Sequence, residues 1–261
     1  MAALHPPRLR RIALAAALAL ACAWSLSAHA VGRLADVRIF DRTLGRELPV
    51  LWHDGRAYVV GRPGDEYEVS VRNRAGEDLL AVMSVDGVNV VTGQTASPAQ
   101  SGYVLGAWER TEVRGWRKSL RETAAFYFTD LGDSYAARTG RPADVGVIGV
   151  ALFRRARPAV APESVAPMEP PDAERRRMES SNAAPGARVF GVPSAPLGTG
   201  HGRREDSPAR YAQFERATEA PAETVAIYYD SWRNLVARGV IAPRYGRRDP
   251  DPFPAAFVPD P

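Results

Sequence analysis

The clearest alternation of apolar and polar positions in the chain occupies residues 66–72. Tyr67, Val69 and Val71 are apolar or aromatic there, and the residues between them are charged or hydroxylic. Successive side chains of a strand point to opposite faces, so this period of two predicts a strand with one buried face and one face in solvent. The rest of segment 36–153 consists largely of short β-prone runs bounded by glycine.

Two Asp-Gly pairs, at 54–55 and 86–87, each separate two of these runs. A type I′ turn needs positive φ at two successive residues, and Asp-Gly tolerates it, so both pairs predict β-hairpins. Asp86 is therefore interpreted as a turn residue, and Asp86→Asn is expected to be tolerated because Asn-Gly makes the same turn. A calcium or sugar-hydroxyl site formed by Asp86 and Asn89 is the alternative.

Further β-prone runs lie at 103–105, 124–128 and 145–153. Short strands this frequent, with turn signals about every ten residues, predict a mainly β chain built as an antiparallel β-sandwich-like domain. One or two short helices are expected beside it, and an α+β fold is the alternative.

The composition changes after residue 155. Residues 156–187 are rich in proline and lack an apolar period, which predicts a disordered insertion after the first part of the β-rich domain at 31–155. Residues 188–242 are expected to pack back onto that domain. Residues 243–261 form a proline-rich tail.

Within 188–242, the residues at 211–217 and 224–229 look like strands. Apolar residues then recur at helical spacing over 228–240. This spacing predicts one short amphipathic helix, with Asp230 as the N-cap and Gly239 as the stop at the C-terminal end.

The first thirty residues have the parts of a secretory signal peptide: arginines within 8–11, an uncharged apolar run at 12–24 and Ala-His-Ala at 28–30. As a helix this run spans only about 20 Å, short of the ~30 Å hydrocarbon core. We therefore expect a periplasmic or secreted protein with no transmembrane span after cleavage. An uncleaved anchor, a lipoprotein attached through Cys22 and twin-arginine export are the alternatives.

The net charge of +4 comes mostly from this leader. The first thirty residues hold no acidic side chain, and the remainder carries 31 basic against 30 acidic ones. Phosphate backbones and anionic lipid surfaces require a basic excess, so the sequence predicts no nucleic-acid partner.

Several chemistries are absent from the sequence after residue 30. Cys22 is the only cysteine, so disulfides and thiolate metal sites are excluded there. His53 and His201 are the only histidines beyond the leader, so a three-histidine metal site is impossible. The usual motifs for nucleophilic serine, zinc and phosphate chemistry are missing. No cofactor and no metal are therefore expected.

One glycine-rich segment is a weak candidate for chemistry. Residues 197–204 contain alternating glycines, then His201 and two arginines, so backbone amides beside Gly200, Arg203 and Arg204 are a candidate anion site. Proline-rich sequence precedes the segment where a phosphate loop needs a strand, and a mobile glycine loop is the main interpretation. If the protein has a catalytic residue, we expect it to be His201.

Three aromatic residues form the candidate binding surface: Tyr103, Trp108 and Trp116 lie among glycines and arginines. Exposed rings beside arginines hold sugars or the anchor residues of a partner. Tryptophans of a β-rich domain also fill cores, so burial of these rings is the alternative.

Eight segments together resemble a family of exported bacterial proteins of uncharacterised function. The resemblance implies that the residues after the insertion belong with the β domain, and it brings no activity, cofactor or site residue. These segments are 84–93, 102–105, 115–119, 124–128, 134–136, 146–153, 197–202 and 228–241.

These patterns favour a non-enzymatic binding or assembly module of the cell envelope, with a protein or glycan partner. The alternative function is a hydrolase acting on envelope or extracellular polysaccharide. An enzyme would be expected to gather carboxylates or His201 in a cleft, whereas a binding module would be expected to expose an aromatic patch.

Overall fold

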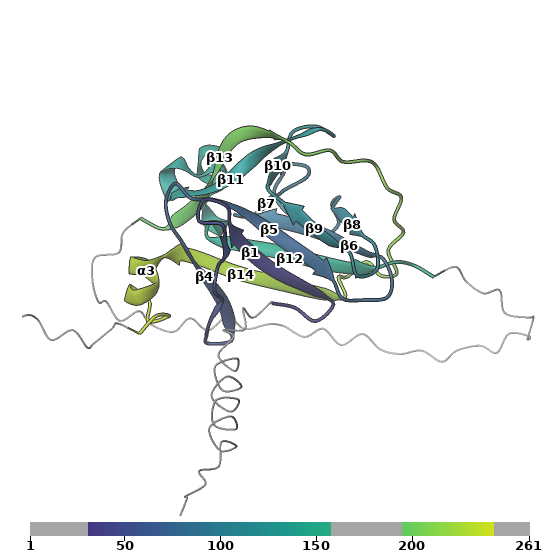
Figure 1. The fold of residues 1–261 in the computed structure, drawn as a ribbon, viewed down its shortest axis with the longest axis horizontal. Helices are drawn as coiled ribbons and strands as arrows, with labels where there is room; N and C mark the ends of the chain where they lie inside the picture. Colours follow the sequence, from purple (N-terminus) through teal and green to yellow (C-terminus); the bar gives the residue numbers. More distant parts are fainter. Residues whose placement is uncertain (1–30, 158–194, 243–261) are drawn as a thin grey trace, which may run out of the picture.

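The computed structural model of the protein describes residues 31–157 and 195–242. Two sheets, each of seven strands, are packed face to face (Figure 1). The first sheet contains β1 (Ala35–Asp41), β2 (Arg46–Glu47), β5 (Glu66–Asn73), β9 (Arg110–Val113), β10 (Gly115–Arg117), β11 (Glu122–Asp130) and β13 (Leu197–Asp206).

The second sheet contains β3 (Leu51–His53), β4 (Arg56–Gly61), β6 (Leu79–Val85), β7 (Val88–Asn89), β8 (Tyr103–Leu105), β12 (Val147–Arg154) and β14 (Glu223–Ser231). The helical elements are short: η2 (Leu131–Asp133), α2 (Tyr135–Arg138), η3 (Pro142–Asp144) and α3 (Trp232–Ala237). The predicted mainly β, sandwich-like fold is confirmed.

The core lies between the two sheets. The apolar positions of the alternating segment, which is β5, are buried there, and they meet Met83 of β6 and Ile227 of β14 from the other sheet in one cluster. Fully burying a side chain of this size contributes about 1.5–3 kcal/mol, so these positions stabilise the packing of the two sheets. The predicted solvent face is only partly exposed, because Glu68 and Ser70 are buried as well.

Both Asp-Gly hairpins are confirmed. Asp54 and Gly55 have φ of 48° and 71° between β3 and β4, and Asp86 and Gly87 have φ of 53° and 69° between β6 and β7. The second hairpin is shorter than predicted. Its return strand ends at Asn89, whose side chain accepts hydrogen bonds from the backbone of Val91 and Thr92 and turns the chain.

The strands after residue 194 complete both sheets. β13 pairs antiparallel with β11 in the first sheet. In the second sheet, β14 lies between β12, to which it is antiparallel, and β4, to which it is parallel. Figure 1 shows these late strands, in green and yellow-green, among strands coloured purple to teal. The described residues on either side of 158–194 therefore share one core.

Two local expectations need correction. Residues 211–217 form no strand, and only Arg216 pairs, in a single bridge with Arg155. The segment instead covers the outer face of the second sheet, where Phe214 packs on an apolar cluster and the guanidinium of Arg216 lies 4.2 Å from the ring centroid of Phe153. Phe214 thus packs on the neighbouring sheet without joining it, whereas Tyr211 is exposed.

The helix predicted after β14 is present, but its N-cap is Ser231, whose hydroxyl accepts from the backbone N–H of Asn234. Asp230 lies within β14, and Gly239 has φ of 75° just past the helix, as expected for a stop. In the described part of the chain, no helix is long and apolar enough to cross a membrane. The predicted leader, the tail and most of the insertion lie outside the described residues.

Candidate functional site

His201 stands at the centre of a small aromatic surface. Its exposed ring is stacked with Trp116, at 6.2 Å between ring centroids and an interplanar angle of 10°. The ring of Tyr135 is tilted against it, at 5.4 Å and 34°. The three rings come from β13, β10 and α2, which are distant in sequence. We call this cluster, together with Lys118, Arg138 and Arg204, whose charges act on the imidazole, the His201 surface.

A bulge in β13 decides which arginine joins this surface. His201 pairs with Phe126, and Arg204 pairs with Ala124. The two residues between His201 and Arg204 in β13 therefore lie opposite the single residue between Phe126 and Ala124 in β11. In a regular strand, residues three apart point to opposite faces, and the extra residue brings Arg204 back to the face of His201. Arg203 is turned to the other face.

The turn before α2 positions Tyr135. Ser134 is fully buried, and its hydroxyl donates to the carbonyl of Leu131 at 2.7 Å and accepts from the backbone N–H of Ala137 at 3.2 Å. This turn packs directly on β13, because a Cβ at Gly198 would stand 2.6 Å from the Cβ of Ser134. The glycine therefore lets α2 approach β13 closely enough for Tyr135 to meet His201.

The electrostatic surroundings of His201 are positive. Partial burial lowers the pKa of its imidazole below the ordinary value of 6.5, and the charges of Lys118, Arg204 and Arg138 lower it further. Arg204 lies 3.3 Å from a carboxylate oxygen of Glu122. Across residues 31–157 and 195–242, Lys118 and Arg138 make no ion pair.

The predicted glycine loop is wrong, because the segment belongs to the strand β13, which pairs with β11. A Cβ at Gly200 would lie 2.1 Å from the ring of Tyr127, so this glycine leaves room for an aromatic side chain of the paired strand. An amide nest for an anion requires a turn-like backbone, which a paired strand does not offer. Gly200 is therefore not part of an anion cradle.

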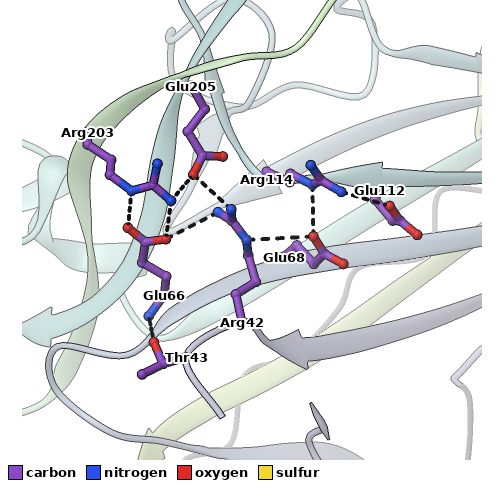
Figure 2. Close-up of polar contacts among 8 residues, drawn as sticks. All are labelled: Arg42, Thr43, Glu66, Glu68, Glu112, Arg114, Arg203 and Glu205. Atoms are coloured by element: carbon purple, nitrogen blue, oxygen red, sulfur yellow. Dashed lines mark hydrogen bonds and ion pairs between the residues drawn. The ribbon is translucent and has the colours of Figure 1, made fainter. Parts of the chain in front are cut away.

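Arg203 belongs to an ion-pair cluster on the outer face of the first sheet (Figure 2). Its guanidinium contacts Glu66 at 2.8 Å and also Glu205. Arg42 lies between Glu205, at 2.8 Å, and Glu66, at 3.4 Å. Figure 2 also shows Arg114 between Glu68 and Glu112 at the end of this cluster. Each arginine here faces carboxylates, so the cluster has no cation left over for an anionic ligand.

The three predicted aromatic residues do not form one platform. Trp116 is only 2% exposed, so its ring packs against His201 and presents no face to solvent. The hydroxyl of Tyr103 accepts from Arg117 at 3.1 Å, and its ring is partly buried. Trp108 is 61% exposed and has φ of 64°, a backbone conformation that bulky residues rarely adopt.

Asp86 lies in a buried polar network that the sequence did not reveal. Its carboxylate accepts from the backbone N–H of Thr199 at 2.7 Å and from the hydroxyl of Tyr229. The hydroxyl of Thr199 lies 2.7 Å from that of Tyr229 and 2.6 Å from that of Tyr67. This network joins the two sheets, and Asp86 has no access to solvent.

No metal centre is found among residues 31–157 and 195–242, where no group of three or more His, Asp or Glu side chains is placed to hold an ion. Asn89, the suggested partner of Asp86, holds backbone amides of its own loop. The Asp86–Asn89 alternative thus has no support in the geometry.

The sequence selected His201, Trp116 and Arg204 separately, and the structure brings them together. It missed Tyr135, Lys118 and Arg138, which reach the surface only through the packing of α2 and β10 against β13. Lys118 had one signal, since it is the only lysine in the chain. Comparisons of the chain with known protein families, curated proteins and solved structures found no match.

Proposed function

We propose that this protein is a non-enzymatic binding or assembly module that is exported to the cell envelope, and that the His201 surface is its binding surface. The observation that carries the proposal is the exposed imidazole of His201, which is stacked on Trp116 and tilted against Tyr135. Aromatic side chains held rigidly by packing bind a partner at a low entropic cost.

The surroundings of His201 favour binding over hydrolysis. A histidine that acts as a general base is normally oriented by a second polar group and hydrogen-bonded to the group that it activates. In the described residues, the hydrogen bonds of the His201 segment involve other side chains and the backbone, and the imidazole has no carboxylate or hydroxyl partner. The contacts with Trp116 and Tyr135 instead orient the ring through packing.

The proposal is tested with residues 31–261 and polysaccharide extracted from bacterial envelopes. Co-sedimentation measures retention, and the release of reducing ends measures hydrolysis. We expect His201→Ala to lower retention at least tenfold. The matched control His53→Ala, which changes the other histidine of this piece, should leave retention unchanged.

Two results contradict the proposal. Equal retention of wild type and His201→Ala would show that the His201 surface is not the binding surface. Release of reducing ends that depends on His201 would show that the protein is a hydrolase.

A further inference from the structure

β14 is a central strand of the second sheet, but part of one of its edges has no partner. It pairs with β12 along residues 223–228. On its other side, β4 pairs with it only from Ile227 onward, because the turn at Asp54 and Gly55 connects β4 to β3 at this level. Residues 223–226 of β14 therefore have no strand beside them on that side.

The backbone groups of this edge are exposed. Tyr229 donates its N–H to the carbonyl of Gly146 at 2.9 Å, so the odd-numbered residues of β14 direct their backbone groups toward β12. Thr224 and Ala226 direct theirs the other way, and both residues are exposed. Within the described residues, the N–H of Ala226 and both backbone groups of Thr224 have no hydrogen-bond partner. Such an edge can pair with another extended chain.

A cleft of about 420 Å³ lies against this edge. Its lining includes Thr224 and Ala226, the hairpin tip at 55–56, the segment 31–33 and Trp52 of β3. The indole of Trp52 is 55% exposed, so its ring is available to a ligand. The volume is within the range of about 300–1,000 Å³ that is usual for ligand clefts, and it holds only a few residues of a peptide.

The charged groups of the cleft favour an anionic end group. Among the residues that line it, Arg33 and Arg56 are the cations and Glu223 is the one carboxylate. The two oxygens of Glu223 accept from the backbone N–H groups of Arg33 and Leu34, at 2.7 and 2.6 Å. The guanidinium of Arg56 lies 5.5 Å from the ring centroid of Tyr228 and makes no ion pair with a described residue. Arg56 can therefore contact a carboxylate that enters the cleft.

We propose that this cleft binds the free C-terminal end of a partner polypeptide as an added strand beside β14. The peptide backbone pairs with Thr224 and Ala226, its terminal carboxylate contacts Arg56, and an apolar side chain packs on Trp52. Only three backbone groups are open, so the added strand is short, as at a chain end. The inference goes beyond the proposed function, because the cleft belongs to the second sheet and the His201 surface to the first.

The test uses residues 31–261 and an array of random hexapeptides with free C-termini. We expect a subset of these peptides to bind. The same sequences with C-terminal amides should bind at least tenfold more weakly, because the amide lacks the charge that Arg56 contacts. N-methyl groups placed in turn on the last three peptide amides should weaken binding at least tenfold at one position or more, because the carbonyl of Thr224 needs a donor.

Two pairs of variants locate the bound peptide, with fluorescence anisotropy as the measurement. Arg56→Gln should weaken binding of the free acids at least tenfold, whereas Arg72→Gln, which changes an exposed arginine of the first sheet, should leave it unchanged. Trp52→Ala should weaken binding at least fivefold, whereas Trp108→Ala, which removes another exposed indole, should not.

The proposal is wrong if no peptide of the array binds, if the amides bind as tightly as the acids, or if no N-methyl group weakens binding. It is equally wrong if Arg56→Gln and Trp52→Ala bind the peptides as tightly as their matched controls.

Discussion

Asp86 illustrates how much one side chain can connect. It adopts the positive φ of a hairpin turn, and its buried carboxylate accepts from Gly146, Thr199 and Tyr229. Burial raises its pKa to about 6, although the hydrogen bonds to the carboxylate oppose this rise. The expectation that Asp86→Asn is tolerated therefore changes. The NH₂ group of an asparagine at this position would face one of the N–H or O–H donors that the carboxylate now accepts from.

We predict that Asp86→Asn lowers the free energy of unfolding at pH 7 by about 1–3 kcal/mol, since one buried donor loses its acceptor.

The folded-state pKa of Asp86 lies above the unfolded value of about 4, so the folded state binds more protons between about pH 4 and 6. This contribution to stability is therefore present below pH 4 and is lost as pH rises through 6. Urea denaturation between pH 4 and 7 measures the free energy of unfolding of both proteins. As pH falls, the value for wild type should rise by up to about 3 kcal/mol relative to that of Asp86→Asn. A constant difference would contradict this account of Asp86.

The two tryptophans of the predicted binding stretch should respond oppositely to truncation. Trp116→Ala leaves a cavity in the core and should lower the free energy of unfolding by about 3–5 kcal/mol. Trp108→Gly should gain about 1 kcal/mol, because glycine relieves the positive φ of an exposed residue. Thermal melts of both variants check this, and a large loss in Trp108→Gly would show that its ring contributes to the fold.

β13 owes its position to the glycines that the sequence analysis assigned to a loop. Gly198 admits the turn before α2, and Gly200 admits the ring of Tyr127. The bulge between His201 and Arg204 then sorts the two arginines onto opposite faces. The strand thus creates the His201 surface on one side and completes the ion-pair cluster on the other.

Gly200→Ala should therefore destabilise the protein by about 1–3 kcal/mol through overpacking against Tyr127. Gly132→Ala is the control, because nothing lies within 4 Å of a Cβ at that position. In a protein that already carries Tyr127→Ala, Gly200→Ala should lower the free energy of unfolding by less than it does in wild type. A double-mutant cycle measured by urea denaturation checks this. Additive losses would mean that Tyr127 is not the reason for the glycine.

Local sequence patterns predicted individual strands and turns. The features that depend on contacts between distant segments could not be predicted from them. The Asp-Gly turns and the alternation of β5 depend on neighbouring residues, so the sequence contained them. The strand at 197–202 depends on its pairing with β11, and the orientation of Arg204 depends on a bulge that no local signal marks. His201 was identifiable as one of few histidines, whereas its contact with Tyr135 requires the whole fold.

The molecule as a whole is one sandwich assembled from both sides of segment 158–194. β13 pairs along most of β11, and β14 is a central strand of the second sheet. We predict that limited proteolysis within 158–194 yields two fragments that remain together in native gel filtration. Separation of the fragments without denaturant would show that the strand pairs of β13 and β14 do not hold the halves together.

The central claim, that the His201 surface is the binding surface, is tested most directly by NMR of the imidazole signals in residues 31–261. Only His53 and His201 contribute, so each is a reference for the other. In the free protein, the pKa of His201 should lie below its ordinary value. Polysaccharide extracted from bacterial envelopes should change the imidazole signals of His201, because the ligand packs on that ring, and should leave the signals of His53 unchanged. Unchanged signals of His201, or equal changes at both histidines, would contradict the account.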